Sequence, residues 1–445
     1  MTTCVDYDYI ISGAGAAGLS LAYWLINSPL ADKKILLLDK TPKISNDRTW
    51  CFWAKQALPF AACKQLSWGT LAVSYQNERH ISDIHPYRYY HTRSEDFYAE
   101  ILALLATRPN VHLKYEDITE WGSDQGQAWV STTKGTYTSQ WLFNSLPPSL
   151  SSSPAIIRQA QHFIGVHLRT KTKAFDPDCV EFMDFRVPQL DAPCFMYVLP
   201  FSADEALLEF TVFSAETFDQ AIYHREIQRY LREKYEIQDW EPIELEQGYI
   251  PMTNQTFERK ESPRVLNIGS RGGLTKPTTG YTFSPIQKDC QAIVASLLAY
   301  DTPFAIAEKP SRYRFYDRLL LTIMDQEPFR IAPIMSRLFQ ANSFPRILQF
   351  LDEKSSFLQE INMLVRLPWA PFLRAILSPL FYDSFFSTSQ LPHRRVQPTS
   401  VSDLPLDSPL APVDGNDDLH PHHGSYRNSS RSHRSPGLPT TVSTP

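Results

Sequence analysis

The pattern of apolar and polar positions is most regular near the start of the chain. Two short apolar runs, at 7–12 and 34–38, flank a glycine-rich stretch at 13–18 and a longer apolar segment at 19–26. Short apolar runs bounded by turn residues are typical of buried strands, and the longer segment is typical of a buried helix. This region therefore predicts a strand–turn–helix–strand unit.

The middle of the chain has a different pattern. Between residues 161 and 214, four consecutive runs alternate apolar and polar residues, FIGVHLRT, CVEFMDFRV, CFMYVLPFS and ALLEFTVFS. Alternation of this kind predicts half-buried strands, and four in succession predict an antiparallel sheet. A helix is expected over 218–235, followed by a strand at 248–252 that returns to the first domain.

From residue 311 to 387 the pattern becomes helical, and apolar faces alternate with basic edges in segments such as RYRFYDRLLLTIM and PFLRAILSPLF. Two interpretations stay open, an ordinary helical cap on the core and helices that lie against a membrane surface. The most apolar stretch, 367–386, is interrupted by prolines and charges, so we expect it to lie on a bilayer rather than cross one.

Composition narrows the class of protein. Hydrophobic residues make up 43% of the 445 residues, enough for a large core, and the net charge of −5 gives no support for nucleic-acid binding. The six cysteines form no CxxC pair, so neither a disulfide framework nor a metal site is expected. The last 55 residues contain nine Pro, nine Ser and one aromatic residue, which predicts a tail without a folded core.

The glycine-rich stretch reads GAGAAG and fits the GxGxxG pattern of dinucleotide-binding folds. Gly13 permits a tight turn, Gly15 lets the backbone approach a pyrophosphate, and Gly18 lets the helix pack closely on the sheet. Asp39 ends the second strand 21 residues after Gly18, where a ribose hydroxyl needs an acceptor. The alternative is a glycine turn without a ligand.

A second glycine-rich segment, RVLNIGSRGGLTKPTTGYTF at 264–283, suggests which dinucleotide is bound. It starts as a strand and continues into a loop that contains Gly269, Gly273, Pro277 and Gly280, which exclude regular structure. An N-terminal fingerprint combined with such a loop far along the chain suits FAD. An ordinary surface loop is the alternative.

These segments suggest a mixed α/β (α+β in the substrate region) architecture with five parts. We expect an FAD/NAD(P)-binding Rossmann-like part at 1–150 and an antiparallel-sheet substrate region at 151–250. The chain should return to the FAD-binding domain at 251–300. A helical C-terminal, membrane-proximal cap at 301–387 and a disordered tail at 388–445 complete the prediction.

The segment NDRTWCFW at 46–53 combines a cation, Arg48, with aromatic rings, and can pass beside a flavin and line an apolar pocket. Here the chain closely resembles the lycopene β-cyclases of carotenoid biosynthesis, bacterial type. The resemblance extends in family order from residue 6 to about 385. It includes FMDF at 182–185, LLEFT at 207–211, GYIPMT at 248–253 and the loop IGSRGGLTKPTTGYTF.

The resemblance implies a flavoprotein that uses reduced FAD, with NAD(P)H as the electron source, on lycopene or a related acyclic carotenoid. Each acyclic ψ end is protonated, the cation is attacked by a nearby double bond, and proton loss leaves a β-ionone ring without net redox change. A substrate dissolved in lipid implies peripheral attachment to the cytoplasmic face of a membrane. The alternative function is an FAD-dependent oxidoreductase, a hydroxylase or polyprenyl reductase, acting on an apolar substrate.

Protonating an alkene requires a carboxyl group that stays neutral until it reacts, and burial in an apolar strand achieves this by raising the pKa. Glu209 occupies the acidic position of the LLEFT motif between apolar neighbours, and we predict it as the general acid. Strand alternation leaves open that it points outward instead. Asp184 in FMDF is the second catalytic candidate, either holding Glu209 protonated or forming a structural hydrogen bond.

Overall fold

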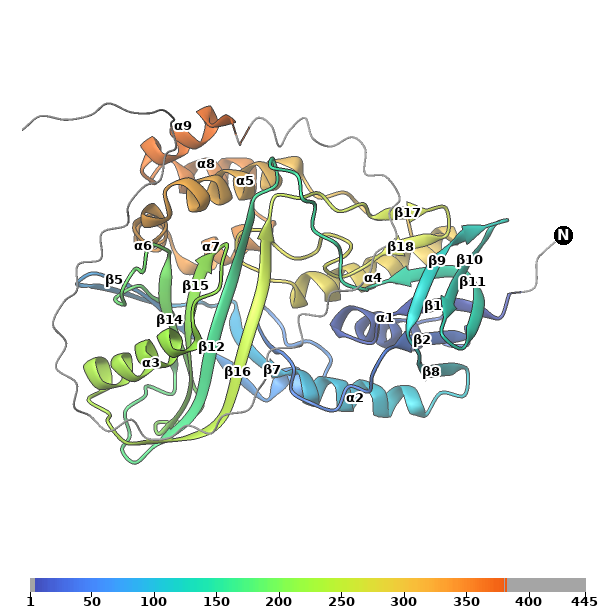
Figure 1. Ribbon diagram of the computed structural model, residues 1–445, viewed down its shortest axis with the longest axis horizontal. Helices are drawn as coiled ribbons and strands as arrows, with labels where there is room; N and C mark the ends of the chain where they lie inside the picture. Colours follow the sequence, from blue (N-terminus) through green and yellow to red (C-terminus); the bar gives the residue numbers. More distant parts are fainter. Residues whose placement is uncertain (1–4, 380, 382–445) are drawn as a thin grey trace, which may run out of the picture. The chain divides into compact units, whose positions relative to one another are not determined.

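Three β-sheets organise the computed structural model, which describes residues 5–379 and 381 (Figure 1). The first sheet has the order β17-β18-β11-β1-β2-β8, extended by β10 and β9 beside β11, and its central strands are parallel. Its strands are β1 (Tyr7–Ser12), β2 (Ile35–Asp39), β8 (Val111–Tyr115), β9 (Ile118–Asp124), β10 (Gln127–Thr132), β11 (Gly135–Asn144), β17 (Lys260–Ser262) and β18 (Val265–Asn267).

Three helices accompany this sheet: α1 (Ala16–Ile26), α2 (Ser94–Ala106) and α4 (Phe283–Tyr300). Strand β2 is buried along its whole length, as expected for a parallel strand covered on both faces. Side chains of β1, β2 and the three helices share one apolar core, which includes Leu19, Phe97 and Ile293. The predicted strand–turn–helix–strand unit is thus β1, α1 and β2.

The second sheet has the order β16-β12-β15-β14-β13-β5-β6 and is antiparallel except where β13 pairs with β5. Its strands are β5 (Thr70–Tyr75), β6 (Glu78–Asp83), β12 (Arg158–Thr170), β13 (Cys179–Asp184), β14 (Cys194–Pro200), β15 (Glu205–Ser214) and β16 (Trp240–Thr253). Helix α3 (Gln220–Tyr235) packs on one face of this sheet through Tyr223 and Leu231.

The opposite face of the second sheet shares a core with the C-terminal helices, which are drawn in orange at the top of Figure 1. Met324, Ile334 and Leu348 come from these helices, and Phe195 and Leu207 come from the sheet. The helical elements are α5 (Ser311–Gln326), the 3-10 turn η2 (Pro328–Arg330), α6 (Ile331–Ala341), α7 (Phe344–Leu351), α8 (Phe357–Leu364) and α9 (Trp369–Leu377).

A small third sheet, ordered β3-β7-β4, connects the two larger ones. It consists of β3 (Thr49–Ala54), β4 (Leu66–Trp68) and β7 (Arg88–Arg93), with the 3-10 turn η1 (Ala62–Lys64) before β4. Alternate residues of β3 face different cores, since Phe52 belongs to the core of the first sheet and Trp53 to that of the second.

The predicted mixed α/β architecture, with its antiparallel sheet and helical C-terminal region, is confirmed. One assignment differs, because 1–150 was predicted as the FAD-binding part, whereas β5 and β6 lie in the second sheet. Their place depends on pairing between β5 and β13, about a hundred residues apart, which local patterns do not encode.

The prediction for residues 388–445 lies outside the described residues, as does the last part of 367–386. None of the helices in the described part of the chain combines the length and apolar character needed to cross a bilayer.

Candidate active site

The first glycine loop follows β1 and leads directly into α1. Gly13 has a φ of +95°, which favours glycine, and a Cβ on Gly18 would lie 1.9 Å from the carbonyl oxygen of Gly13. A Cβ on Gly15, in contrast, would meet no atom within 4 Å. Two glycines thus allow the turn to close, and the third leaves open space in front of the helix.

Asp39 at the end of β2 supports this loop from the side. Its carboxylate accepts a hydrogen bond of 2.7 Å from the backbone N–H of Ala14, and the N–H of Gly13 donates to the carbonyl of Leu38. The N-terminus of α1 has no side-chain cap, so its first amides face the open space beside Gly15. Free helix amides and a positive dipole end suit a phosphate group.

The second glycine loop lies against both the start of α1 and the second sheet. Gly269 has a φ of +61°, and a Cβ there would lie 2.7 Å from the Cβ of Ala17 in α1. Gly280 has a φ of +70°, and its Cβ would lie 2.9 Å from the side chain of Ile250 in β16. This loop therefore links the nucleotide-type turn to the antiparallel sheet.

The remaining predicted cofactor residues lie in these same regions. Gly273 has a φ of +73° and Pro277 is half-buried, both within the second loop. The Arg48 side chain is exposed, whereas its backbone N–H donates to the Ser94 hydroxyl at the start of α2. An uncapped helix, a glycine with open space and an exposed cation are together compatible with a bound dinucleotide such as FAD.

Glu209 belongs to a row of residues that crosses four strands of the second sheet. In the strand register, Tyr197 of β14 is opposite Glu209 of β15, Glu209 is opposite Gly165 of β12, and Gly165 is opposite Glu246 of β16. An added Cβ on Gly165 would lie 2.9 Å from the Cγ atoms of both Glu209 and Glu246. The missing side chain therefore lets two carboxyl groups approach each other across an intervening strand.

The Glu209 side chain is buried and lies on the face of the sheet opposite α3. The neighbouring residues Leu208 and Phe210 pack toward α3, so alternation turns Glu209 the other way, toward the face that the second glycine loop contacts. Burial raises the pKa of Glu209 well above its usual range, and the negative charge of Glu246 raises it further. The outward orientation that the sequence left open is not found.

Aromatic hydroxyls continue from Glu209 toward the second glycine loop. Tyr197 donates a hydrogen bond of 2.7 Å to the hydroxyl of Tyr89, which lies 3.4 Å from the hydroxyl of Tyr281. The ring of Tyr281 also packs edge-on against Trp53, with centroids 4.4 Å apart. Apolar and aromatic surface thus surrounds the acid on the side of the loop.

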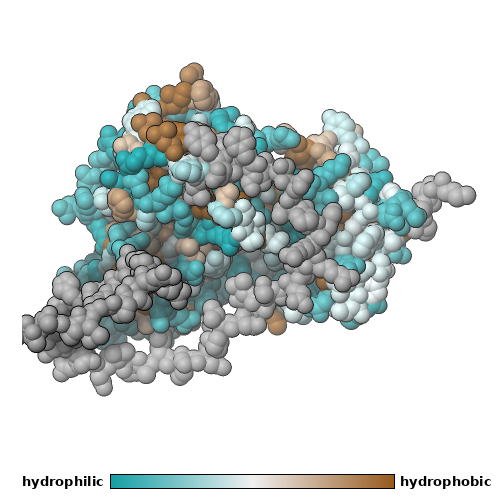
Figure 2. Space-filling model, turned by 45° about the horizontal axis from the view of Figure 1, so that its top comes forward, coloured by the Kyte–Doolittle hydropathy of each residue, from teal (hydrophilic) through white to brown (hydrophobic). Residues whose placement is uncertain are grey.

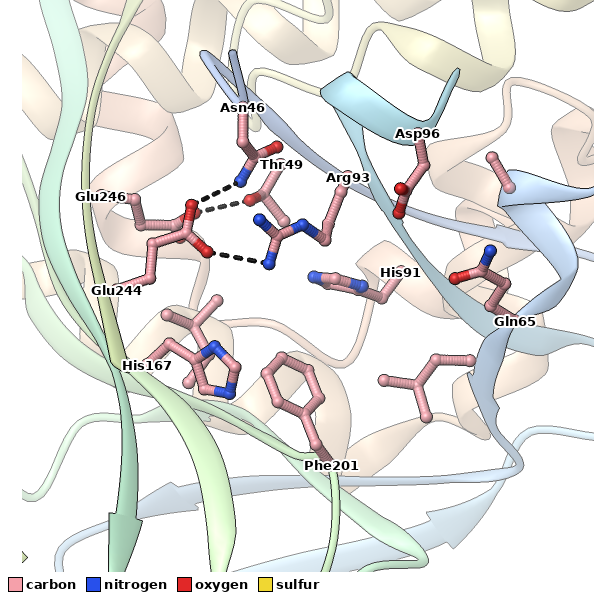
Figure 3. Close-up of a pocket in the computed structure, with 13 residues that line it drawn as sticks. Asn46, Thr49, Gln65, His91, Arg93, Asp96, His167, Phe201, Glu244 and Glu246 are labelled. Carbon is pink, nitrogen blue, oxygen red and sulfur yellow. Dashed lines mark hydrogen bonds and ion pairs between the residues drawn. The ribbon is translucent and has the colours of Figure 1, made fainter. Parts of the chain in front are cut away.

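A polar pocket of about 200 Å³ lies on the other side of the carboxyl pair (Figure 3). Arg93 forms an ion pair of 2.8 Å with Glu244, and Asn46 donates to the same carboxylate. Thr49 donates to Glu246, and the ring of His91 faces the interior. The pocket is lined by Asn46, Thr49, Ala62, Gln65, Leu66, His91, Arg93, Asp96, His167, Phe201, Leu207, Glu244 and Glu246.

Asp184 does not join Glu209, because it lies on the α3 face of the same sheet. Its carboxylate binds Arg186 at 2.7 Å and Lys234 at 3.0 Å, and accepts a hydrogen bond from Tyr230. Burial by itself raises the pKa of Asp184, but these cations and their hydrogen bonds outweigh it and lower the pKa well below the usual range. The geometry supports the structural alternative for Asp184 and not the catalytic one.

Sequence reasoning missed two residues of this site, Gly165 and Glu246. Gly165 was read as one position in an alternating strand, and Glu246 lies just before the GYIPMT motif. The available signal was weak, a glycine inside a strand, which often marks close approach of neighbouring groups. The strand register that brings them beside Glu209 follows only from the sheet.

Comparison with solved structures identifies the fold. The halogenase PltM, solved with phloroglucinol and FAD, matches with a TM-score of 0.52 and 13% identity over 85% of this chain and 89% of that one. The p-nitrophenol 4-monooxygenase PnpA from Pseudomonas putida DLL-E4 has a TM-score of 0.51 and 12% identity, covering 82% and 98%. A flavoprotein/dehydrogenase from Cytophaga hutchinsonii has a TM-score of 0.50 and 10% identity, covering 83% and 98%.

These likenesses show that the chain has the mixed α/β FAD-binding fold of the monooxygenase type, with an antiparallel sheet and a helical C-terminal region. No curated protein sequence matched the chain. The family model described as lycopene cyclase protein matches residues 8–377, which is most of the chain and includes both glycine loops and Glu209. On this evidence the chain belongs to the lycopene cyclase family.

Proposed function

We propose that this protein is a lycopene β-cyclase that converts ψ end groups of lycopene, or of a related acyclic carotenoid, to β-ionone rings. The family match supports the enzyme class. The observation that carries the proposal is Glu209, a carboxyl group buried in the sheet face next to the second glycine loop, with a raised pKa. A neutral acid in an apolar site is what protonation of an alkene requires.

In the proposed reaction the Glu209 carboxyl gives its proton to one carbon of a terminal double bond. The π electrons of that bond form the new C–H bond, and the cation left on the neighbouring carbon is attacked by a second double bond, which closes the ring. Loss of one proton from the ring then restores a double bond. One proton enters and one leaves, so no oxidant or reductant is consumed.

Aromatic rings near Glu209 suit a cationic intermediate. Trp53 is 4% exposed and packs against Tyr281, and Tyr89 packs edge-on against Phe182. Ring faces attract cations, and the attraction grows when water is excluded. We assign to these rings the role of surrounding the folded end group and keeping water from capturing the cation.

We propose FAD, in its reduced form, as the cofactor, with NAD(P)H as the electron source. Asp39, Gly15 and the first turn of α1 would hold the nucleotide and pyrophosphate, and the loop from Gly269 to Gly280 would lie along the flavin. When bound in reduced form, the flavin supplies negative charge that stabilises a nearby cation in a low-dielectric site.

We further propose that the protein binds peripherally to the cytoplasmic face of a membrane, from which it takes its lipid-dissolved substrate. Hydrophobic residues, coloured brown, gather at the top of Figure 2, over the C-terminal helices. Large apolar side chains exposed by 46–78% support this surface, which we call the apolar patch: Phe329, Phe357, Leu358, Ile361, Val365, Trp369, Leu373 and Leu377. Arg330 and Arg374, which follow Phe329 and Leu373 in the chain, are half-exposed and both pair with Glu327. Their exposed sides suit anionic lipid headgroups.

The proposed function is tested by expressing the chain in bacteria that accumulate lycopene and analysing the pigments by mass and absorption. A cyclase yields β-ring products of unchanged mass. Products of altered mass would instead indicate the FAD-dependent oxidoreductase, and unchanged lycopene would contradict catalysis of either kind.

The acid assignment is tested by Glu209→Gln, which keeps the shape of the side chain but carries no acidic proton. We expect cyclisation to fall by about 10²–10⁴-fold, the usual contribution of a general acid, while FAD binding is retained. Glu205→Gln is the matched control, because Glu205 lies on the same strand but pairs with Arg169 and His167. Normal turnover by Glu209→Gln would exclude Glu209 as the acid.

A further inference from the structure

The two oxygens of Glu246 have different surroundings. Oε2 accepts a hydrogen bond of 2.5 Å from the Thr49 hydroxyl, whereas Oε1 is buried and has no hydrogen-bond partner among the described residues. Oε1 lies 3.1 Å from the position of a Cβ on Gly165, in the gap that Glu209 enters from the other side. A proton located between the two carboxyl groups would satisfy this oxygen.

Only one member of the pair reaches the polar pocket. Glu246 is among the pocket's lining residues together with Thr49, His91 and Arg93, whereas Glu209 is not (Figure 3). On its remaining sides Glu209 has the apolar and aromatic surface of the second sheet. Glu246 thus lies between the acid and a polar space of about 200 Å³.

The proposed reaction creates a need that this arrangement meets. After giving its proton to the substrate, Glu209 is an anion in an apolar site, a state of high free energy. A direct approach of water to Glu209 would also bring water to the cation. A carboxyl group that contacts Glu209 on one side and a polar pocket on the other can return the proton without admitting water to the substrate.

We propose that Glu246 is the positioning residue that relays a proton from the polar pocket back to Glu209 after each turnover. This inference rests on the proposed cyclase function. In each cycle the Glu209–H bond breaks and a C–H bond forms. Water in the pocket then protonates the Glu246 carboxylate, and the new Glu246–H bond breaks as Glu209–H forms again. The hydroxide left in the pocket is neutralised by the proton that the ring loses when its C–H electrons form the double bond, so no net proton is consumed.

The groups around Glu246 come from each element packed against it. They are Thr49 and Cys51 on β3, His91 and Arg93 on β7, Asp96 on α2, His167 on β12, Glu209 on β15 and Glu244 on β16. Burial raises the pKa of the Cys51 thiol well above its usual range, so this group is uncharged near pH 7. Arg93 is engaged by Glu244 and Glu95. Burial, together with the charge of Arg93, lowers the pKa of His91 to about 4, so this ring is neutral near pH 7. Glu209 is therefore the group whose titration a change at Glu246 most directly alters.

The sign of the pH effect follows from the charge of Glu246. This charge raises the pKa of Glu209, so its neutral form persists to higher pH than burial alone would allow. Replacing Glu246 by Gln removes the charge and lowers the pKa of Glu209. The acid is then lost at lower pH, and the alkaline limb of the rate profile moves toward lower pH.

The test uses the full-length, FAD-loaded enzyme with reductant and lycopene in liposomes, and compares Glu246→Gln, Glu246→Asp and Glu241→Gln. For Glu246→Gln we expect the steady-state rate of cyclisation to fall at least tenfold, whereas the rate of the first turnover stays closer to normal. The alkaline limb of the rate–pH profile should move to lower pH. Glu246→Asp keeps a carboxyl group and should return the alkaline limb part of the way to its wild-type pH. Glu241 is exposed on the same strand and does not line the pocket, so Glu241→Gln should keep the wild-type pH dependence.

A wild-type rate and an unchanged alkaline limb in Glu246→Gln would overturn the proposal. If Glu246→Gln does not fold, Thr49→Val gives a second reading. This substitution removes the hydrogen bond to the Glu246 carboxylate, so the carboxyl pair holds its proton more tightly and the alkaline limb should move to higher pH. An alkaline limb at the wild-type pH would again overturn the proposal. If the Glu209→Gln enzyme is inactive and the Glu246→Gln enzyme has normal activity, only the proton return by Glu246 is refuted. If the wild-type enzyme itself has no cyclase activity, the proposed function is refuted.

Discussion

The gap at Gly165 offers a direct test of how the site is built. Gly165→Ala adds one methyl group between Glu209 and Glu246 and removes no polar group. The new carbon would lie 2.9 Å from each Cγ and 3.1 Å from Oε1 of Glu246, against 3.4–4 Å for ordinary van der Waals contact. Gly165 has no positive φ, so the substitution does not strain the backbone.

The expected size of the effect follows from these distances. Each carboxylate must move away by at least about half an ångström, and overpacking of this kind costs about 1–3 kcal/mol of stability. The displaced acid is a greater loss, since a misplacement of about 1 Å can cost about 10²-fold in rate. We therefore expect a loss of 10-fold or more in cyclisation with a decrease of only a few degrees in Tm.

The assay measures lycopene cyclisation by the FAD-loaded variant together with its Tm and FAD content. Gly122→Ala is the matched control, because its Cβ would lie 3.0 Å from the Trp129 ring, in the first sheet and away from the carboxyl pair. It should lower Tm to a similar extent and leave the rate unchanged. A Gly165→Ala enzyme with lowered Tm and wild-type rate would refute the inferred role of the gap.

Three further outcomes are expected. Asp184→Asn should lower the free energy of unfolding by about 3 kcal/mol at pH 7. Because folding lowers the pKa of Asp184, the difference in stability between wild type and variant should shrink as the pH falls below about 4, which unfolding curves at several acidic pH values measure. Gly15→Val should fold normally, since its Cβ position is open, but lose FAD, measured by flavin absorbance of the purified protein. Leu358→Glu with Leu377→Glu should reduce flotation with anionic liposomes. Ile44 lies outside the apolar patch and is even more exposed, and Ile44→Glu should leave flotation unchanged.

Much of the fold follows from local sequence patterns. The first βαβ unit is marked by two apolar strands, a glycine turn and Asp39, because each glycine meets a steric need that acts over only a few residues. The antiparallel strands and helix α3 follow from period-two and period-3.6 patterns, which are also local. Motifs in family order added the family, and the family match over 8–377 bears it out.

The sequence alone determined the first βαβ unit, the antiparallel strands between 161 and 214, the helical C-terminal region, the nucleotide-type turn and Glu209 as an acid within an apolar strand. Tertiary structure alone decided which face that acid takes, which carboxyl group lies beside it, and that Asp184 faces α3 instead. The physical reason is that strand register and sheet order are set by pairing between distant segments. A glycine on β12 becomes a gap between two carboxyl groups only when β15 and β16 are hydrogen-bonded on either side of it.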